Sequence, residues 1–137
     1  MNIIRQLLII FTAAFALNFV WEHWHSVFYL HYQGQEITNL ILARAALFDA
    51  IFITALALPF IFISFFRRRL WLAPLIAVLF AVGLEIFALK TGRWAYTDAM
   101  PLVPIINLGL TPIIQLGLLA FVSYKLGFGR PVKFFNF

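Results

Sequence analysis

Four long apolar segments constrain this chain more than any other feature of its sequence. They span about residues 3–30, 40–66, 70–89 and 104–124, and polar or basic stretches separate them. A helix of ~20 apolar residues crosses the ~30 Å hydrocarbon core of a bilayer. Backbone amides in hydrocarbon must be satisfied within their own segment, which favours helices over open strands. We therefore predict an all-α polytopic membrane protein, with four transmembrane helices in an up-down-up-down bundle.

The scarcity of charge supports a bilayer as the natural solvent. Hydrophobic residues make up 64% of the 137 residues and charged residues only 11%, whereas roughly a quarter of a soluble domain is charged. The net charge of +5 then indicates basic residues that flank the spans, and no nucleic-acid partner. The sequence contains no cysteine, which excludes thiol catalysis and cysteine-based metal sites. We expect one domain surrounded by membrane lipid, with no cofactor.

The distribution of lysine and arginine predicts the orientation of the four spans. More basic residues lie on the side of the chain ends and the second loop than on the opposite side. The positive-inside rule places the richer side in the cytoplasm. We therefore expect a multi-pass protein of the inner (cytoplasmic) membrane, with both termini cytoplasmic and residues 125–137 forming an interfacial tail. The richer side carries Arg5, Arg67, Arg68, Arg69, Lys125, Arg130 and Lys133, and the other side carries Arg44, Lys90 and Arg93.

The first span contains polar residues at helical spacing. Asn18, Glu22 and His25 stand at positions i, i+4 and i+7, and therefore share one face of a helix. His23 points elsewhere. An ionisable residue inside a membrane is costly to bury unless a partner or a cavity offsets the cost, so it marks a candidate functional site.

The other spans carry polar residues too. Asp49 lies deep in the second span, and Glu85 lies near the outer end of the third. In the fourth span Asn107, Thr111 and Gln115 are spaced four residues apart, so they are predicted to form one polar stripe. Most of these side chains fall in the outer half of the membrane under the predicted orientation. This shared depth indicates a cavity that opens towards the outer side or sideways into lipid.

These residues divide into two predicted roles. Carboxylates and a histidine in one apolar site can serve as acid and base, because their surroundings separate their proton affinities. Glu22-x-x-His25 also has the spacing of a di-iron helix, but such a site needs two of these motifs, so no metal is predicted. The candidate catalytic residues are Glu22, His25, Asp49 and Glu85, and the candidate substrate-binding residues are Asn18, Arg44, Trp94, Tyr96, Asn107, Thr111 and Gln115.

The last third of the chain resembles a known family. A glutamate late in one span is followed by Gly-x-Trp-x-Tyr and by a helix start with Gly-x-x-Pro. This order is similar to that of the lycopene cyclase domain proteins, which are small membrane carotenoid cyclases. The resemblance implies a membrane enzyme that protonates a polyene end group with a carboxylic acid and stabilises the carbocation with aromatic and acidic side chains. The matching residues are Glu85, Gly92, Trp94, Tyr96, Gly109 and Pro112.

The chain departs from those cyclases directly after the proline. They carry paired glutamates there, whereas this chain has Ile113, Ile114 and Gln115. The chain also resembles small four-span bacterial membrane proteins, a likeness that implies no particular activity.

Three functions remain open at this stage. The leading hypothesis is an acid/base enzyme that acts on an isoprenoid or another lipid, with Glu22 and Glu85 as the acid/base pair. A proton-coupled or ion transporter would use the same carboxylates. A non-catalytic membrane subunit would use the amide and hydroxyl groups as contacts between helices. Because a bundle of 15.8 kDa has little room for a cavity, we also expect a homodimer.

Overall fold

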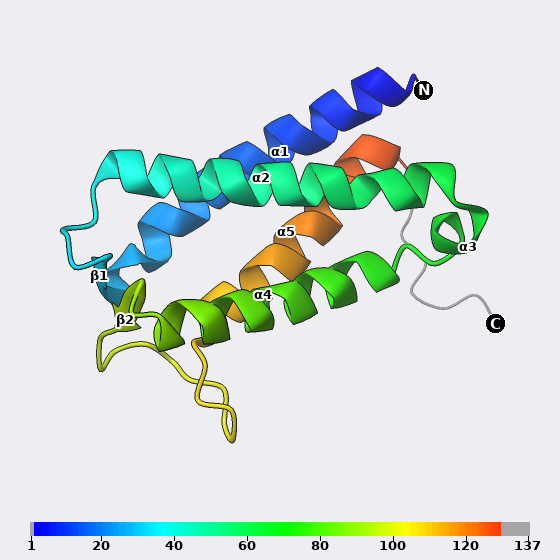
Figure 1. The fold of residues 1–137 in the computed structure, drawn as a ribbon. Helices are drawn as coiled ribbons and strands as arrows, with labels where there is room; N and C mark the ends of the chain where they lie inside the picture. Colours follow the sequence, from blue (N-terminus) through cyan, green and yellow to red (C-terminus); the bar gives the residue numbers. More distant parts are fainter. Residues whose placement is uncertain (1, 130–137) are drawn as a thin grey trace.

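Four long helices form an elongated bundle (Figure 1). The structure, a computed structural model, describes residues 2–129. The helices are α1 (Ile3–His25), α2 (Asn39–Phe62), α4 (Leu72–Lys90) and α5 (Leu110–Phe128), and a 3-10 turn η1 (Ser26–Phe28) extends α1. All four are long and apolar enough to cross a membrane, which confirms the predicted all-α four-helix fold. The predicted tail at 125–137 falls outside the described residues from 130 onwards, and residues 125–128 belong to α5.

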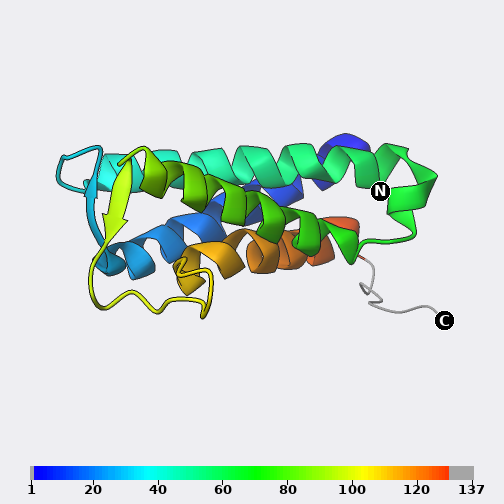
Figure 2. The same ribbon diagram turned by 60° about the horizontal axis from the view of Figure 1, so that its bottom comes forward.

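The helices differ in how closely they pack. Helix α1 packs along both α2 and α5, and α4 packs along α5, whereas α2 and α4 touch at few points. Both helices run along the length of the bundle, and in Figure 1 α5 is seen between α2 at the top and α4 at the bottom, whereas Figure 2 shows α4 in front of α2. Stacked phenylalanines join them: the ring of Phe80 lies 4.1 Å from that of Phe52 and 6.4 Å from that of Phe48. The α2–α4 side is therefore the least tightly packed side of the bundle.

Small residues let the helices approach closely in the half of the bundle next to the short helix α3 (Ser64–Arg67). Ala73, Ala77 and Ala81 recur every fourth residue along α4 and are buried. At Gly117 an added Cβ would lie 3.0 Å from the carbonyl oxygen of Pro74, so only glycine permits this contact between α4 and α5. This half forms a dry core of aliphatic and aromatic side chains.

A short two-stranded sheet closes the other end of the bundle. Strand β1 (Tyr29–Tyr32) follows η1, and strand β2 (Trp94–Tyr96) follows α4. They pair antiparallel, so that Tyr29 lies opposite Tyr96 and Tyr32 opposite Trp94. The first span was predicted to reach residue 30, but its last residues are in β1, because pairing with the distant loop satisfies their backbone groups better than another helical turn.

Two further spans end differently from the sequence prediction. The second helix stops at Phe62 instead of 66, because Ile63 is extended (φ −105°, ψ 120°) before α3 begins. The fourth helix starts at Leu110 instead of 104. Residues 101–109 form a tight loop, closed by hydrogen bonds from Leu110 N to Pro101 O (2.7 Å) and from Val103 N to Leu108 O (2.8 Å).

Candidate active site

A cavity of about 610 Å³ lies in the half of the bundle that carries the β1–β2 sheet. All four long helices contribute to it, and its α2 and α4 walls face each other across the loosely packed side. Three carboxyl groups, one each from α1, α2 and α4, line it together with histidine, arginine, aromatic and small apolar residues. The polar lining residues are Glu22, His25, Ser26, Tyr29, His31, Tyr32, Gln33, Arg44, Asp49, Glu85, Arg93, Trp94 and Gln115, and the apolar ones are Ile37, Ile41, Leu42, Ala45, Phe48, Ala81, Leu84, Pro112 and Leu116.

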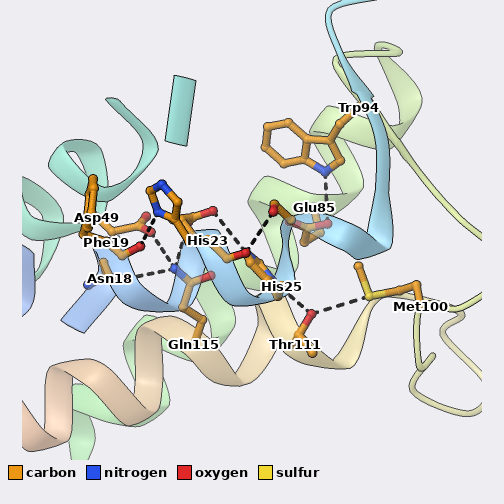
Figure 3. A network of polar contacts seen from close by, with 12 residues as sticks. Asn18, Phe19, His23, His25, Asp49, Glu85, Trp94, Met100, Thr111 and Gln115 are labelled. Carbon is orange, nitrogen blue, oxygen red and sulfur yellow. Dashed lines mark hydrogen bonds and ion pairs between the residues drawn. The ribbon is translucent and has the colours of Figure 1, made fainter. Parts of the chain in front are cut away.

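Gln115 is the centre of the polar network on the α5 wall (Figure 3). Its Nε2 lies within hydrogen-bond distance of Glu22 Oε1 (2.8 Å), Asn18 Oδ1 (2.9 Å) and Asp49 Oδ2 (3.0 Å). An amide nitrogen has two hydrogens, so only two of the three oxygens accept at one time. Because Glu22 and Asp49 share this nitrogen, their carboxyl oxygens lie no more than about 6 Å apart.

Asn18 ends the network on the side of the dry core. Its Nδ2 donates to Ala14 O at 2.7 Å, one helical turn back along α1. The side chain is fully buried, and its oxygen faces Gln115. Asn18 therefore positions the Gln115 amide and stands apart from the cavity lining.

His25 links the carboxylates to α5. Its Nε2 lies 3.0 Å from Glu22 Oε2, and its Nδ1 lies 3.1 Å from Thr111 Oγ1. The Thr111 hydroxyl also lies 3.5 Å from Met100 Sδ, but a thioether sulfur is a weak acceptor. With its hydrogen on Nδ1, His25 donates to the Thr111 hydroxyl and offers Nε2 to Glu22; with the hydrogen on Nε2, it donates to Glu22 and accepts from Thr111. The Glu22–His25 contact is the one acid–base contact within ion-pair distance found among residues 2–129, and it is an ion pair when the imidazole is protonated.

Glu85 has a separate set of donors on the α4 side of the cavity. Its Oε2 accepts from the Tyr96 hydroxyl at 2.5 Å and from Trp94 Nε1 at 3.2 Å. The Tyr96 oxygen in turn accepts from Gly109 N at 3.0 Å. An added Cβ on Gly109 would lie 3.0 Å from Tyr96 Cζ, so a larger residue here would push against the ring. Thus β2 and the start of α5 together hold the Glu85 carboxyl group.

Tyr29 lies between His25 and the residues that hold Glu85. Its ring makes edge contacts with His25 (5.3 Å between centroids), Tyr96 (5.5 Å) and Trp94 (6.1 Å). Burial, followed by the negative charge of Glu85, raises the pKa of Tyr29 well above its usual range. Burial and the hydrogen bond to Glu85 also raise the pKa of Tyr96. Both phenols stay neutral at physiological pH, and they form an aromatic wall next to the carboxylates.

The structure brings together most of the predicted site residues. Glu22, His25, Asp49 and Glu85 line one cavity. Gln115, Arg44 and Trp94 line it as well, while Asn18, Thr111 and Tyr96 support the lining residues by hydrogen bonds.

Asn107 does not join the site, so the predicted stripe of Asn107, Thr111 and Gln115 is broken. Asn107 lies in the loop before α5, exposed and with φ +53°. Its backbone N–H donates to Val103 O and closes a turn in this loop. The helix α5 therefore does not reach back to Asn107. His23 is outside the cluster as predicted, and its Nδ1 contacts Phe19 O at 2.8 Å.

Several polar residues of the cavity were not among the predicted site residues: Ser26, Tyr29, His31, Tyr32, Gln33 and Arg93. Arg93 entered the sequence analysis only in the charge count for orientation. Its position directly after an apolar span and before Trp94 was the available signal. Tyr29 reaches the cavity from strand β1.

Among the described residues, no group of three or more acidic or histidine side chains is arranged to hold a metal ion. The groups that the cavity offers to a ligand are acids, bases, guanidinium groups and aromatic rings. Searches against family models, curated proteins and solved structures give no match to this chain.

Proposed function

We propose that this protein is an intramembrane acid/base enzyme that acts on an isoprenoid or another lipid. The observation that carries the proposal is the cavity itself, in which carboxyl groups from three helices meet beside an aromatic wall on the loosely packed side of the bundle. A lipid chain can enter from the bilayer between α2 and α4 without crossing water.

The Glu22–Asp49 pair supplies the transferable proton in this proposal. Two carboxylates within about 6 Å of each other repel strongly in an apolar cavity, so the arrangement is stable when they share a proton. His25 is placed to exchange a proton with Glu22 through its Nε2. The pair therefore works as an acid that His25 can reprotonate.

Glu85 acts as the base that complements the Glu22–Asp49 acid in this proposal. Protonation of a carbon–carbon double bond by the Glu22–Asp49 pair creates a carbocation, and loss of a proton from a neighbouring carbon to Glu85 forms a new double bond. One proton enters and one leaves, so an isomerisation or ring closure of this kind needs no co-reactant. The faces of Tyr29 and Trp94 can stabilise the cation. Acid/base catalysis of this type contributes roughly 10²–10⁴-fold to a rate.

Transport is supported less well by the same geometry. A proton or ion path must reach both faces of the membrane, but the polar network ends at Asn18 and Ala14. Beyond it, the described core consists of side chains such as Ile10, Ile53 and Phe60. A purely structural role fits poorly as well, because such polar groups would be paired between helices without an enclosed space.

For the membrane and its orientation, we propose the inner membrane, with the α3 end of the bundle on the cytoplasmic side. Arg67, Arg68 and Arg69 lie at this end, next to the described ends of the chain. The cavity then opens in the outer half of the bilayer.

Deuterium labelling tests the proposed chemistry on all candidate lipids at once. The protein is reconstituted in D₂O with the total lipid extract of its native membranes, and the lipids are analysed by mass spectrometry. We expect carbon-bound deuterium in a discrete lipid species. Glu22→Gln, Asp49→Asn and Glu85→Gln should each lower this labelling about 100-fold or more. Glu36→Gln, an exposed residue outside the cavity, is the control and should label normally. Absence of labelled lipid, or equal labelling by the variants, would refute the proposal.

A further inference from the structure

Two arginines from different elements line the cavity. Arg44 is an exposed residue on α2, and Arg93 lies in the turn after α4. Arg44 precedes Asp49 by five positions, which places it about 7.5 Å nearer the start of the helix. The cations therefore lie at the rim of the cavity, while the carboxyl groups lie deeper.

The position of Arg93 is fixed by its backbone. Gly92 adopts φ +68°, and Arg93 N donates to Ala88 O at 2.9 Å, which is the hydrogen bond that ends a helix in a Schellman motif. The Arg93 carbonyl also accepts from Gln33 N. The guanidinium lies 5.9 Å from the centre of the Phe87 ring. Arg93 is thus held at the rim by the end of α4 and by the turn after β1.

Neither guanidinium has a hydrogen-bond or ion-pair partner among residues 2–129, and the only contact found for either is the Phe87 ring. The carboxyl groups of the cavity are held by other donors: Gln115 and His25 on one side, and Trp94 and Tyr96 on the other. Although the chain carries few charged residues, these two arginines line one cavity without an acidic partner among residues 2–129. An external anion is the natural complement.

The wall below the arginines suits an apolar chain. Ala45, Phe48, Leu84 and Leu116 line the cavity between the rim and the dry core. Two unpaired guanidinium groups that line one cavity suit a phosphate group, whose several oxygens can accept hydrogen bonds from more than one donor, better than they suit an uncharged polar group.

We propose that the ligand of this cavity is a phosphate-bearing amphiphile. Arg44 and Arg93 hold its head at the rim, and its apolar chain extends past the carboxyl groups into the cavity. The inference rests on the proposed function and names the substrate class for the same site. An uncharged polyene, such as the resemblance to carotenoid cyclases implies, would leave both arginines unused.

A binding experiment in a neutral detergent tests this inference separately from turnover. The probes are oleoyl-lysophosphatidic acid, monooleoylglycerol with the same chain but no phosphate, and inorganic phosphate alone, each measured by native mass spectrometry. We expect the phosphate-bearing probe to bind at least about tenfold more tightly than the uncharged one. Arg44→Gln and Arg93→Gln should each remove about tenfold of that preference, and Arg67→Gln at the other end of the bundle should not.

The remaining outcomes separate the sources of phosphate. Inorganic phosphate should displace the amphiphile only weakly, and efficient displacement would assign the arginines to free phosphate and overturn the inference. Equal affinity for the two amphiphiles would show that the apolar chain alone drives binding, and the same loss in Arg67→Gln would show unspecific attraction between basic residues and the phosphate. Either result would overturn the inference as well. Ala45→Phe narrows the cavity and should weaken binding of the amphiphile even with both arginines present.

Failure of this inference can be distinguished from failure of the proposed function. Glu22→Gln should keep the binding preference for the phosphate-bearing probe while it loses deuterium labelling. Labelling of an uncharged lipid by a protein without the binding preference would retain the enzyme and reject the phosphate-bearing substrate.

Discussion

The two halves of the bundle are built from the same four helices but differ in what they bury. In the half next to α3, the buried side chains are mainly alanine, isoleucine, leucine and phenylalanine. In the half next to the β1–β2 sheet, buried asparagine, histidine, aspartate, glutamate, threonine and glutamine surround a cavity. The dry half is filled mainly by apolar side chains, and the polar half keeps a cavity open.

From this difference we infer that packing in the dry half fixes the spacing of the helices around the cavity. Polar groups in hydrocarbon add little net stability between helices, typically about 1 kcal/mol or less each. Close packing of small residues, as at Gly117 against Pro74, fixes the spacing of α4 and α5 instead. The polar half can then keep its carboxyl groups around an open cavity. Substitutions in the two halves should separate stability from ligand binding.

The largest effect on stability is expected in the dry half. Phe60 is almost fully buried, and its ring contacts Phe66 and Tyr124. Phe60→Ala should lower the free energy of unfolding by about 2–3 kcal/mol, because the lost ring contacts leave a cavity. The loss is smaller than in a water-soluble core, because burial of an apolar side chain gains less free energy when the alternative surroundings are lipid. Unfolding in mixed micelles measures the loss. Lipid binding by the folded fraction should be unchanged, and a parallel loss of affinity would contradict the division into halves.

A smaller loss of stability is expected at the centre of the polar network. Gln115→Leu removes the shared donor of Asn18, Glu22 and Asp49 and leaves their oxygens buried with fewer partners. We expect a loss of about 2 kcal/mol, from unsatisfied polar groups instead of lost packing. Gln115→Glu offers a contrast, since it keeps the volume but adds a third carboxyl group. It should be destabilising at neutral pH and recover at acidic pH, as measured by thermal unfolding in detergent.

In the polar half, the hydroxyl of Tyr96 should contribute about 1 kcal/mol to the free energy of unfolding, and this contribution should depend on pH. Tyr96→Phe removes the hydroxyl that donates to Glu85 and accepts from Gly109. The folded pKa of Tyr96 is raised above the unfolded value near 10, so its contribution is complete below about pH 10 and declines as the pH rises further. Unfolding should therefore become easier above pH 10 in the native protein. The decline should be shallower in Tyr96→Phe, and an identical decline would refute this assignment.

The smallest effect is expected at Ser123, a polar residue placed among the apolar core residues. Its hydroxyl is fully buried and has no hydrogen-bond partner in the described residues. Ser123→Ala should be neutral or slightly stabilising, because no bond is lost and an unsatisfied group is removed. Thermal unfolding in detergent measures the difference. A loss of more than about 1 kcal/mol would reveal a polar role in the half described as dry.

The helical elements of the site could be predicted from the sequence, because they depend on local spacing. Glu22 and His25 lie one turn apart on α1, and their contact follows from that spacing alone. The pairing of Gln115 with Asp49 could not be predicted, since it requires the order in which four helices pack. Asn107 was misplaced because the loop before α5 uses a positive φ that no helical pattern reveals.

The β1–β2 sheet was not predicted for a related reason. Two strands of three and four residues carry almost no periodic signal, and their pairing joins loops far apart in the sequence. The position of Tyr29 beside Tyr96 depends on that pairing. The aromatic wall is therefore a tertiary feature, although each of its residues is conspicuous in the sequence.

The β1–β2 pairing also sets an order of assembly. The strand after α1 and the strand after α4 can meet only when both loops have arrived on the same side of the membrane, which requires the insertion of both helical hairpins. The backbone hydrogen bonds of the sheet then tie the first hairpin to the second at the mouth of the cavity. The three carboxyl groups that line the cavity therefore come together only when both helical hairpins are in place.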